Sequence, residues 1–508
     1  MKFDSLATQT AVQRNYEGGE AFTMSREMEL YTAVVTCALA PATYEGTDER
    51  VERIAQLVQD TDPAFVARLA VYARTQMNLR SIPLLLAVEL ARVHNGDSLV
   101  ARTVEAIVQR ADEIMELLAC YQWRNPTGES RKKIARLSRQ IQNGLQRAFN
   151  HFDEYQFAKY NSDSRGVKLR DALFLVHPKA KAPAQQQLFD RIANGTLATP
   201  YTWETELSAL GQQHFETPLA KQQAFSAKWQ ELIASRQLGY MALLRNLRNI
   251  LKCPALPSAT ANTVIDTLAD KRRVLKSRQL PFRYLAAYRE VAQTNNLWTQ
   301  GILDALEEAV LVSAENIAGF SQDTSVLIAA DVSGSMYSLL SPRSAIRNYD
   351  IGLLLAMMLK NRCQKVISGI FGDTWMPISL PAGNILANVG AMQAYANKVG
   401  YSTNGHLVID YLCQHNIHID KIMLFTDCQM WDSRAKGNSL RASWHRYKAI
   451  APSARLYLFD LAGYGQAPLS LAEKDVFLIA GWSDKVFDIL AAIENGSAAL
   501  DEINRIEL

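Results

Sequence analysis

The spacing of apolar residues changes near residue 320 and divides the chain into two parts. Before that point, apolar residues recur every three or four positions, as at Ile54, Leu57 and Val58, which predicts amphipathic helices. Short breakers containing proline or glycine separate these segments. Roughly 300 residues of consecutive short helices indicate an α-solenoid of the HEAT type, in which helix pairs stack on one another.

Beyond residue 320, apolar runs of strand length alternate with helical segments. This alternation predicts a doubly wound, mostly parallel sheet with helices on both faces. We therefore expect two domains, a helical domain over residues 1–322 and an α/β domain over residues 323–508. The predicted strands are 325–331, 365–371, 421–427, 455–461 and 476–481, and the predicted helices are 344–359, 383–399, 439–450 and one from Ser483.

Composition indicates a soluble globular protein in a reducing compartment. Hydrophobic residues make up 48% of the 508 positions and charged residues 21%. No run approaches the roughly 18 uninterrupted apolar residues of a membrane span, and the N-terminus lacks a secretory signal. The six cysteines are scattered without C-x-x-C pairs, which argues against disulfides and structural zinc. We expect free thiols and a cytoplasmic location.

The net charge of +3 conceals an uneven distribution along the chain. Residues 101–300 carry 29 Lys+Arg against 17 Asp+Glu, a net charge of +12, whereas residues 323–508 carry 16 against 17. Concentrated positive charge predicts an anionic partner, and nucleic acid is the first candidate. An anionic membrane or an acidic protein remains an alternative.

The positive charge is densest in residues 124–181, which have a net charge of +8. On a helical wheel for residues 130–150, basic side chains, including that of Arg147, form one stripe opposite an apolar stripe. A loop and a second helix follow, in which Arg170 and His177 share a stripe. A solvated charged face is the alternative to phosphate contact. The candidate RNA-binding residues are Lys132, Arg136, Arg139, Lys159, Arg165, Lys168, Arg170 and His177.

Residues 271–289 contain seven basic residues and no acidic one. Phe282, Tyr284 and Tyr288 lie within this segment. Aromatic side chains beside basic ones are typical of single-strand binding, in which bases stack on the rings. Packing of these rings in the hydrophobic core is at least as good an interpretation.

Hydroxyl and carboxylate groups follow the ends of several predicted strands in the α/β part. The segment DVSGSM places Asp331, Ser333 and Ser335 in a turn, and Thr403 and Asp427 follow later. In doubly wound sheets, ligands bind at the carboxyl ends of strands. Oxygen ligands of this kind suit Mg²⁺, or Mn²⁺ as the alternative, with one position left for a ligand's carboxylate or phosphate. The alternative is that the hydroxyls only cap a helix.

No set of residues typical of an enzyme stands out. We find no Ser/His/Asp or Cys/His set, no paired-carboxylate site and no phosphate-binding loop, so we expect a protein without catalytic activity. A metal-dependent nuclease is the weaker alternative. A second alternative is a scaffold that binds another protein through the metal, without a direct role in RNA.

The α/β part resembles a von Willebrand factor A domain with a metal-ion-dependent adhesion site. That resemblance implies the metal ligands Asp331, Ser333, Ser335, Thr403 and Asp427. The whole chain resembles the TROVE-domain family, typified by the Ro ribonucleoprotein autoantigen and its bacterial relatives. The motifs that carry this resemblance are LRDALFLVH (169–177), LGYMALLRNLRNIL (238–251), LPFRYLAAYR (280–289) and ALEEAVLVSAENI (305–317), followed by DVSGSM.

The family resemblance implies a ring of HEAT-like repeats closed by the A domain. It implies binding of small noncoding Y RNAs, with Lys159, Arg170 and His177 on the binding surface. It also implies capture of the single-stranded 3′ ends of misfolded RNAs. The bacterial branch implies a partnership with an exoribonuclease such as polynucleotide phosphorylase, and we expect a monomer within a ribonucleoprotein.

Overall fold

The computed structural model describes residues 12–37, 43–126, 136–161, 166–253, 256–314, 323–340, 344–432, 438–483, 485–498 and 500–508. Contacts divide the chain into two compact units. We call residues 1–57, 279–289 and 306–502 the α/β unit, and residues 58–278, 290–305 and 503–508 the helical unit. This division differs from the boundary after residue 322 that the sequence pattern indicated, because the first described elements pack with the α/β sheet.

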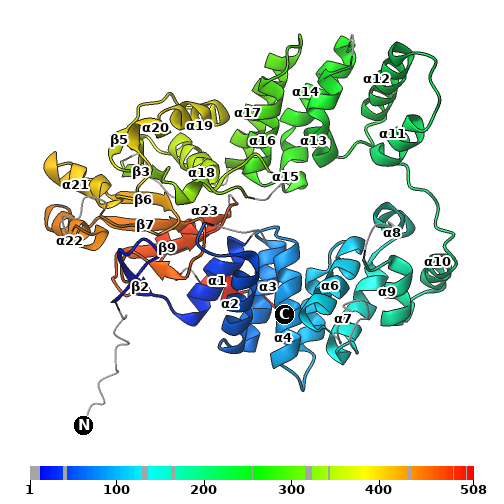
Figure 1. Cartoon of the computed structure of the whole chain (residues 1–508), viewed down its shortest axis with the longest axis horizontal. Helices are drawn as coiled ribbons and strands as arrows, with labels where there is room; N and C mark the ends of the chain where they lie inside the picture. The colour runs from blue at the N-terminus through cyan, green and yellow to red at the C-terminus, as the bar shows by residue number, and fades with distance from the viewer. Residues whose placement is uncertain are drawn as a thin grey trace. The chain divides into compact units, whose positions relative to one another are not determined.

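The helical unit consists of short helices that pack in succession, as the three- and four-residue spacing predicted (Figure 1). Helix α3 packs against α4 and α5, α4 against α6, and α5 against α7. The helices that lie in it, wholly or in part, are α2 (Thr47–Gln59), α3 (Pro63–Thr75), α4 (Ser81–Val93), α5 (Leu99–Ile107), α6 (Ala111–Arg124), α7 (Arg139–Ala148), α8 (Glu154–Tyr160), α9 (Leu169–Val176), α10 (Pro183–Asn194), α11 (Trp203–Gly211), α12 (Pro218–Ala234), α13 (Tyr240–Leu251), α14 (Ser258–Ala269), α15 (Lys271–Ser277), α16 (Pro281–Ala292) and α17 (Thr299–Ala314).

Several prolines that mark breaks in the sequence stand at the first position of a helix. Pro63 begins α3, and the side chain of Asp62 accepts a hydrogen bond from the backbone N–H of Phe65 at 3.1 Å. Proline fits this position because its missing N–H would have no partner within the helix. Pro218 begins α12 in the same way, after the capping residue Thr217.

Gly144 in α7 lies where two helices approach closely. A Cβ atom there would come within 2.6 Å of the Val104 Cβ and 2.7 Å of the Ala101 carbonyl oxygen, both on α5. The absence of a side chain therefore permits the packing of α7 on α5. Glycine usually weakens a helix interior, yet α7 continues through this residue to Ala148.

The α/β unit contains a six-stranded sheet in the order β5-β4-β3-β6-β7-β9. All neighbouring pairs are parallel except β4 and β5, which are antiparallel, so the predicted mostly parallel sheet is confirmed. The strands are β3 (Ser325–Asp331), β4 (Lys365–Phe371), β5 (Trp375–Pro377), β6 (Lys421–Thr426), β7 (Arg455–Asp460) and β9 (Val476–Ala480). The helices of this part are α18 (Asn348–Arg362), α19 (Ile385–Ala394), α20 (Ala396–Val399), α21 (His406–Gln414), α22 (Leu440–Ile450), α23 (Val486–Glu494) and α24 (Asp501–Asn504).

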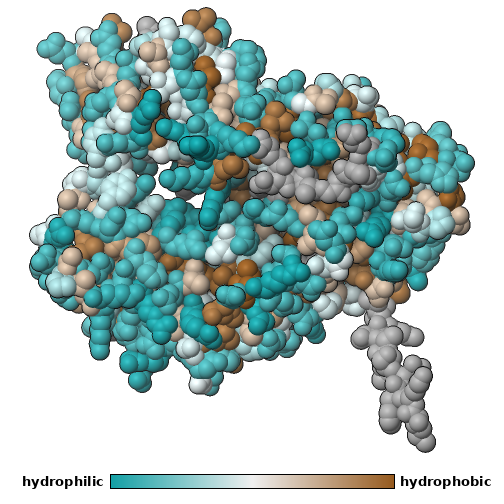
Figure 2. Space-filling view, turned by 180° about the vertical axis from the view of Figure 1, so that it is seen from behind, coloured by the Kyte–Doolittle hydropathy of each residue, from teal (hydrophilic) through white to brown (hydrophobic). Residues whose placement is uncertain are grey.

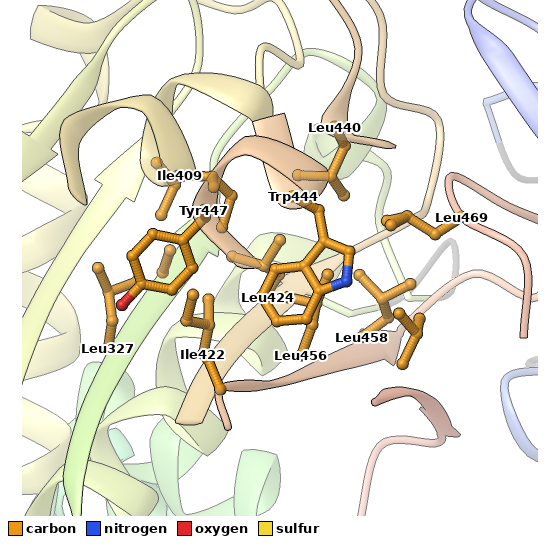
Figure 3. Packing of buried hydrophobic residues seen from close by; sticks show 14 of the residues in the cluster. Leu327, Ile409, Ile422, Leu424, Leu440, Trp444, Tyr447, Leu456, Leu458 and Leu469 are labelled. Carbon is orange, nitrogen blue, oxygen red and sulfur yellow. The ribbon is translucent and has the colours of Figure 1, made fainter. Parts of the chain in front are cut away.

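One hydrophobic cluster fixes α21 and α22 on the sheet (Figure 3). Trp444 and Tyr447 of α22 are almost fully buried against alternate residues of the central strands, among them Leu424 and Leu456. On the other set of alternate positions, Phe425 stacks on Phe459 with ring centroids 4.3 Å apart. Both faces of the sheet are therefore buried, which accounts for the continuous apolar runs in its strands.

An N-terminal segment that the sequence pattern assigned to the helical domain belongs to the α/β unit. Strands β1 (Val12–Arg14) and β2 (Glu20–Thr23) form a hairpin, and β2 pairs with β8 (Gln466–Ala467). Helix α1 (Arg26–Val35) follows, and its Tyr31 hydroxyl donates to the carbonyl oxygen of Ala480 at 3.0 Å. These contacts place α1 on the sheet near β9 and the hairpin beside β8.

The surface and the cysteines agree with the composition. The face in Figure 2 is mainly hydrophilic, with hydrophobic residues in small groups. Among the described residues, no helix is both long enough and apolar enough to cross a membrane. The six cysteines are free thiols, as their spacing predicted.

Candidate metal centre and nucleic-acid interface

The turn after β3 gathers three of the predicted metal ligands. The carboxylate of Asp331 accepts a hydrogen bond from the backbone N–H of Ser333 at 2.8 Å. The hydroxyl oxygens of Ser333 and Ser335 lie 3.2 Å apart. All three side chains are buried. A carboxylate and two hydroxyls thus converge at the carboxyl end of a central strand.

Asp427 follows the neighbouring strand β6 and joins this group. Its Oδ1 accepts from the backbone N–H of Gln429 at 3.0 Å, and the Ser335 hydroxyl also interacts with the carboxylate. The buried Oδ2 of Asp427 has no hydrogen-bond partner among the described residues. A buried carboxylate oxygen without a donor is costly, so this atom fits a position that binds a cation.

Thr403 lies on a loop that touches both ligand-bearing segments. The backbone N–H of Gly334 donates to the carbonyl oxygen of Tyr401 at 2.8 Å. The backbone N–H of Trp431 donates to the carbonyl oxygen of Thr403 at 3.2 Å. The Thr403 side chain is buried, and its hydroxyl makes no hydrogen bond within the described part of the chain. It therefore remains available as a ligand.

Burial shapes the electrostatics of this edge of the sheet. Loss of water raises the pKa of Asp331, while the hydroxyls of Ser333 and Thr426 oppose the rise. The pKa of Asp427 is raised by burial and then by the neighbouring Asp331 carboxylate. Two buried carboxylates of like charge destabilise each other, and a divalent cation between them would remove that repulsion.

A metal site of another type is not found among the described residues. Across the ranges that the structure describes, no group of three or more His, Cys, Asp or Glu side chains is placed to hold a metal ion. The donor set at the sheet edge consists of two carboxylates and hydroxyls. Such oxygen donors suit a hard cation such as Mg²⁺ better than Zn²⁺.

Three residues near this centre were missed in the sequence. The Thr43 hydroxyl donates to the carbonyl oxygen of Ser335 at 2.8 Å, and the Tyr44 hydroxyl donates to the carboxylate of Glu17. Asp460 ends β7, and burial raises the pKa of its carboxyl group to about 6. The position of Asp460 at the end of an apolar run was a usable signal. Thr43 and Tyr44 gave none, because they approach the sheet from nearly 300 residues away in sequence.

The predicted cationic stripe over residues 130–150 is wrong in part. Helix α7 begins at Arg139, so Arg136 precedes it, and the carbonyl oxygen of Arg136 accepts from the Tyr121 hydroxyl at 3.0 Å. Arg147 is on α7 but pairs with Glu105 at 3.1 Å. The wheel failed because Ser138, with φ of −53° and ψ of 134°, is not helical and α7 begins only after it. Lys132 and Arg165 lie outside the described residues.

Arg139 is exposed at the start of α7, and the other four candidates are exposed around α8 and α9. Lys159 lies at the end of α8, and Lys168 and Arg170 lie at the start of α9. His177 ends α9 in the left-handed conformation with φ of 50°, so it leaves the helical stripe that we expected it to share with Arg170. The carbonyl oxygen of His177 accepts from the Gln146 side chain at 3.2 Å, which anchors this turn on α7.

Two of the three aromatic residues of 271–289 lie in the hydrophobic core. Phe282 and Tyr284 are buried, so their rings belong to the core and the packing alternative holds for them. Arg289 makes a two-point ion pair with the buried Asp350, at 2.9 and 2.6 Å. Arg289 and these two rings therefore have structural roles.

Comparison with known proteins agrees with this architecture. The profile of the TROVE domain matches residues 23–214 and 195–316, and that of the Ro60 vWA domain matches residues 325–493. The crystal structure of the Deinococcus radiodurans RO (RSR) protein has a similar fold, with a TM-score of 0.60 and 20% identity. The alignment covers 93% of this chain and 100% of that one.

Curated relatives match over a shorter region. Telomerase protein component 1 is 23% identical over 321 residues in Rattus norvegicus and 24% identical over 319 residues in Mus musculus. Each match covers 48% of this chain and only 12% of the relative. Since the TROVE profile covers more than half of the chain, the chain belongs to the TROVE-domain family, and it combines that domain with a vWA domain of the Ro60 type.

Proposed function

We propose that the chain is the RNA-binding protein of a ribonucleoprotein that binds small noncoding Y RNAs and the single-stranded 3′ ends of misfolded RNAs. Membership of the TROVE-domain family supports the RNA-binding role. In this proposal the protein presents RNAs to an exoribonuclease and has no catalytic activity itself. The net charge of +12 over residues 101–300 supports an anionic ligand on the helical unit.

The observation that carries the proposal is the state of three basic side chains on α8 and α9. Lys159, Arg170 and His177 are exposed, and none has a carboxylate partner among the described residues. Other arginines of this unit, such as Arg147 and Arg191, pair with a glutamate. When unpaired cationic side chains bind phosphates, they displace the counterions condensed on the RNA. The release of these ions makes such side chains the main source of RNA affinity.

We further propose that the turn after β3 holds Mg²⁺ or Mn²⁺. Asp331, Ser333, Ser335, Thr403 and Asp427 would hold the cation, directly or through water. The unpartnered Oδ2 of Asp427 supports this assignment. When bound, the cation would supply an open position for a carboxylate or phosphate oxygen of a ligand.

The test combines RNA sequencing with a matched set of variants. RNA crosslinked to the purified full chain is sequenced, and the recovered species is transcribed for filter binding. The triple variant Lys159→Ala, Arg170→Ala, His177→Ala should reduce its affinity at least tenfold. It should also make the negative slope of log K against log salt shallower by about two to three, since each duplex phosphate contact contributes about 0.9 to its magnitude.

The control variant is Arg147→Ala with Arg191→Ala, which removes arginines that pair with glutamates on the same unit. It should bind RNA nearly as the unaltered chain does. Equal loss of affinity in both variants would mean that the three residues act only through general charge. The triple variant should keep any increase in thermal stability caused by Mg²⁺.

A further inference from the structure

A cavity of about 280 Å³ opens where the ends of six helices of the helical unit meet. It is lined by residues at or near the starts of α4, α6, α11 and α13, from α8, and from the end of α12. The residues that matter here are Arg110, Lys159, Tyr160, Trp203 and Arg245. The volume is near the lower limit of small-molecule sites, which suits one building block of a larger ligand.

Flat aromatic rings and cations lie together in this cavity. The guanidinium of Arg110 lies 4.5 Å from the ring centroid of Tyr160, and the ammonium of Lys159 lies 5.7 Å from it. Trp203 is half-buried and stacks on Trp229 with centroids 6.1 Å apart. Aromatic rings together with cations are the arrangement on which nucleobases stack.

The charge of the lining is mostly positive. Arg80, Arg110, Lys159 and Arg245 line the cavity, against one acidic residue, Glu204. Arg80 and Arg110 share Asp112 as an ion-pair partner. Lys159 and Arg245 have no carboxylate partner among the described residues and are exposed. These two side chains are free to contact an anion.

Backbone groups add to this preference. Helix α13 is 12 residues long, and its capping residue Gly239 provides no side-chain hydrogen bond to the first turn. Gly239 and the first-turn residues Met241 and Ala242 line the cavity. The backbone N–H groups at a helix start carry partial positive charge and favour phosphate.

A second cavity shares part of this lining, which favours a polymer as the ligand. This neighbouring cavity of about 430 Å³ is also bordered by Lys159, Tyr160, Thr202 and Glu204, and it extends along residues 197–200. A free nucleotide would need only the first space. A strand of RNA would occupy both, with a phosphate near the shared Lys159.

We propose that this cavity binds one nucleotide of single-stranded RNA, with its base against Tyr160 or Trp203 and a phosphate against Lys159 and Arg245. The proposal rests on the proposed RNA-binding function and assigns a subsite to it. Lys159 then contributes to the unpaired basic surface of α8 and α9 and to this cavity. The nucleotide in the cavity would not stack on its neighbours in the RNA.

The test uses the full chain and a fluorescein-labelled oligouridylate of 12 nucleotides, with binding followed by anisotropy. Arg245→Gln should lower the slope of log K against log salt by about 0.7, the value of one single-strand phosphate contact. Its matched control is Arg248→Gln, on the same helix α13, where the arginine pairs with Glu290 at 2.7 Å. Arg248→Gln removes the same charge and should leave the slope unchanged.

Stacking is tested by Trp203→Leu, which should weaken binding about five- to hundredfold. If this variant unfolds, photocrosslinking of an oligonucleotide with 4-thiouridine to the unaltered chain replaces it. Crosslinks should fall on peptides that contain Tyr160 or Trp203. Crosslinks confined to other peptides would overturn the proposal.

The outcomes separate the cavity from the broader function. If the unaltered chain binds no single-stranded RNA at low salt, the proposed function itself fails. If it binds RNA and Arg245→Gln behaves as Arg248→Gln does, only the cavity assignment fails. Binding of uridine monophosphate as tight as that of the oligonucleotide would overturn the assignment to RNA and indicate a free-nucleotide site.

Discussion

Substitution of Gly144 by alanine tests the packing of the helices beneath the basic surface. Helix propensity alone predicts that Gly144→Ala stabilises α7 by about 1 kcal/mol. The structure predicts the opposite, because the added methyl group would lie 2.6 Å from the Val104 Cβ and 2.7 Å from the backbone oxygen of Ala101. A backbone atom cannot relieve the clash by a change of rotamer, as a flexible side chain can. The helices α7 and α5 must therefore move apart.

The size of the effect follows from two opposing contributions. Overpacking of a tight interior costs about 1–3 kcal/mol, and with three contacts under 3 Å we take the upper part of that range. The gain in helix propensity offsets about 1 kcal/mol. The net loss of stability is then about 1–2 kcal/mol. For a unit of this size, that loss lowers Tm by roughly 2–8 °C.

The assay is calorimetry combined with hydrogen exchange, which reports where stability is lost. Gly144→Ala should lower the Tm of one unfolding transition and speed amide hydrogen exchange in α5 and α7. Gly390→Ala is the matched control, since Gly390 is exposed within α19 and an added Cβ would meet no atom within 4 Å. The control should keep or raise Tm. A rise for Gly144→Ala, or equal effects of the two changes, would refute the close approach of α7 and α5.

The other predictions concern the metal centre and the ion pair of α16. Burial raises the pKa of Asp427 above its value in the unfolded chain. Without metal, the free energy of unfolding should therefore fall as pH rises from about 4 through neutrality, because the unfolded chain ionises this carboxyl group more easily than the folded chain does. In EDTA, Asp427→Asn should therefore raise stability by about 1–3 kcal/mol at pH 8 and have little effect at about pH 4, as measured by urea denaturation. Mg²⁺ should stabilise the unaltered chain, by about 2.7 kcal/mol at one hundred times its Kd, and should not stabilise Asp427→Asn; equal responses would exclude Asp427 as a ligand. Arg289→Leu leaves the fully buried carboxylate of Asp350 without its arginine partner and should cost about 3–5 kcal/mol. Arg248→Leu, which breaks an exposed ion pair, should cost less than about 1 kcal/mol. Equal losses of stability in the two variants would show that burial does not determine the cost of breaking an ion pair.

The sheet of the α/β unit was predictable because its strands are buried on both faces. A continuous apolar run such as 422–425, flanked by helical segments, is typical of a central parallel strand. The turn after Asp331 was predictable for a local reason, since the predicted ligands in it are two residues apart. The edge strand β5 was not, because its three residues are too short to show a period.

Long-range contacts account for what the sequence pattern missed. The hairpin of β1 and β2 joins β8 across more than 440 residues, and no periodicity records such a partner. The cationic stripe failed for a different reason. A wheel assumes one continuous helix, whereas the chain leaves the helical conformation at Ser138 and again at His177. Paired arginines such as Arg147 also look identical in sequence to unpaired ones.

Filter binding of RNA to the purified full chain across a salt series tests the proposed RNA-binding function most directly. We expect retention of single-stranded RNA at about 50 mM salt, with affinity that falls steeply as salt rises, because unpaired cations on the helical unit contact phosphates. Each lost contact should lower the slope by about 0.7 to 0.9. No retention at low salt would contradict this function, and capture of a protein without RNA that is insensitive to salt and lost in EDTA would favour a metal-dependent protein scaffold.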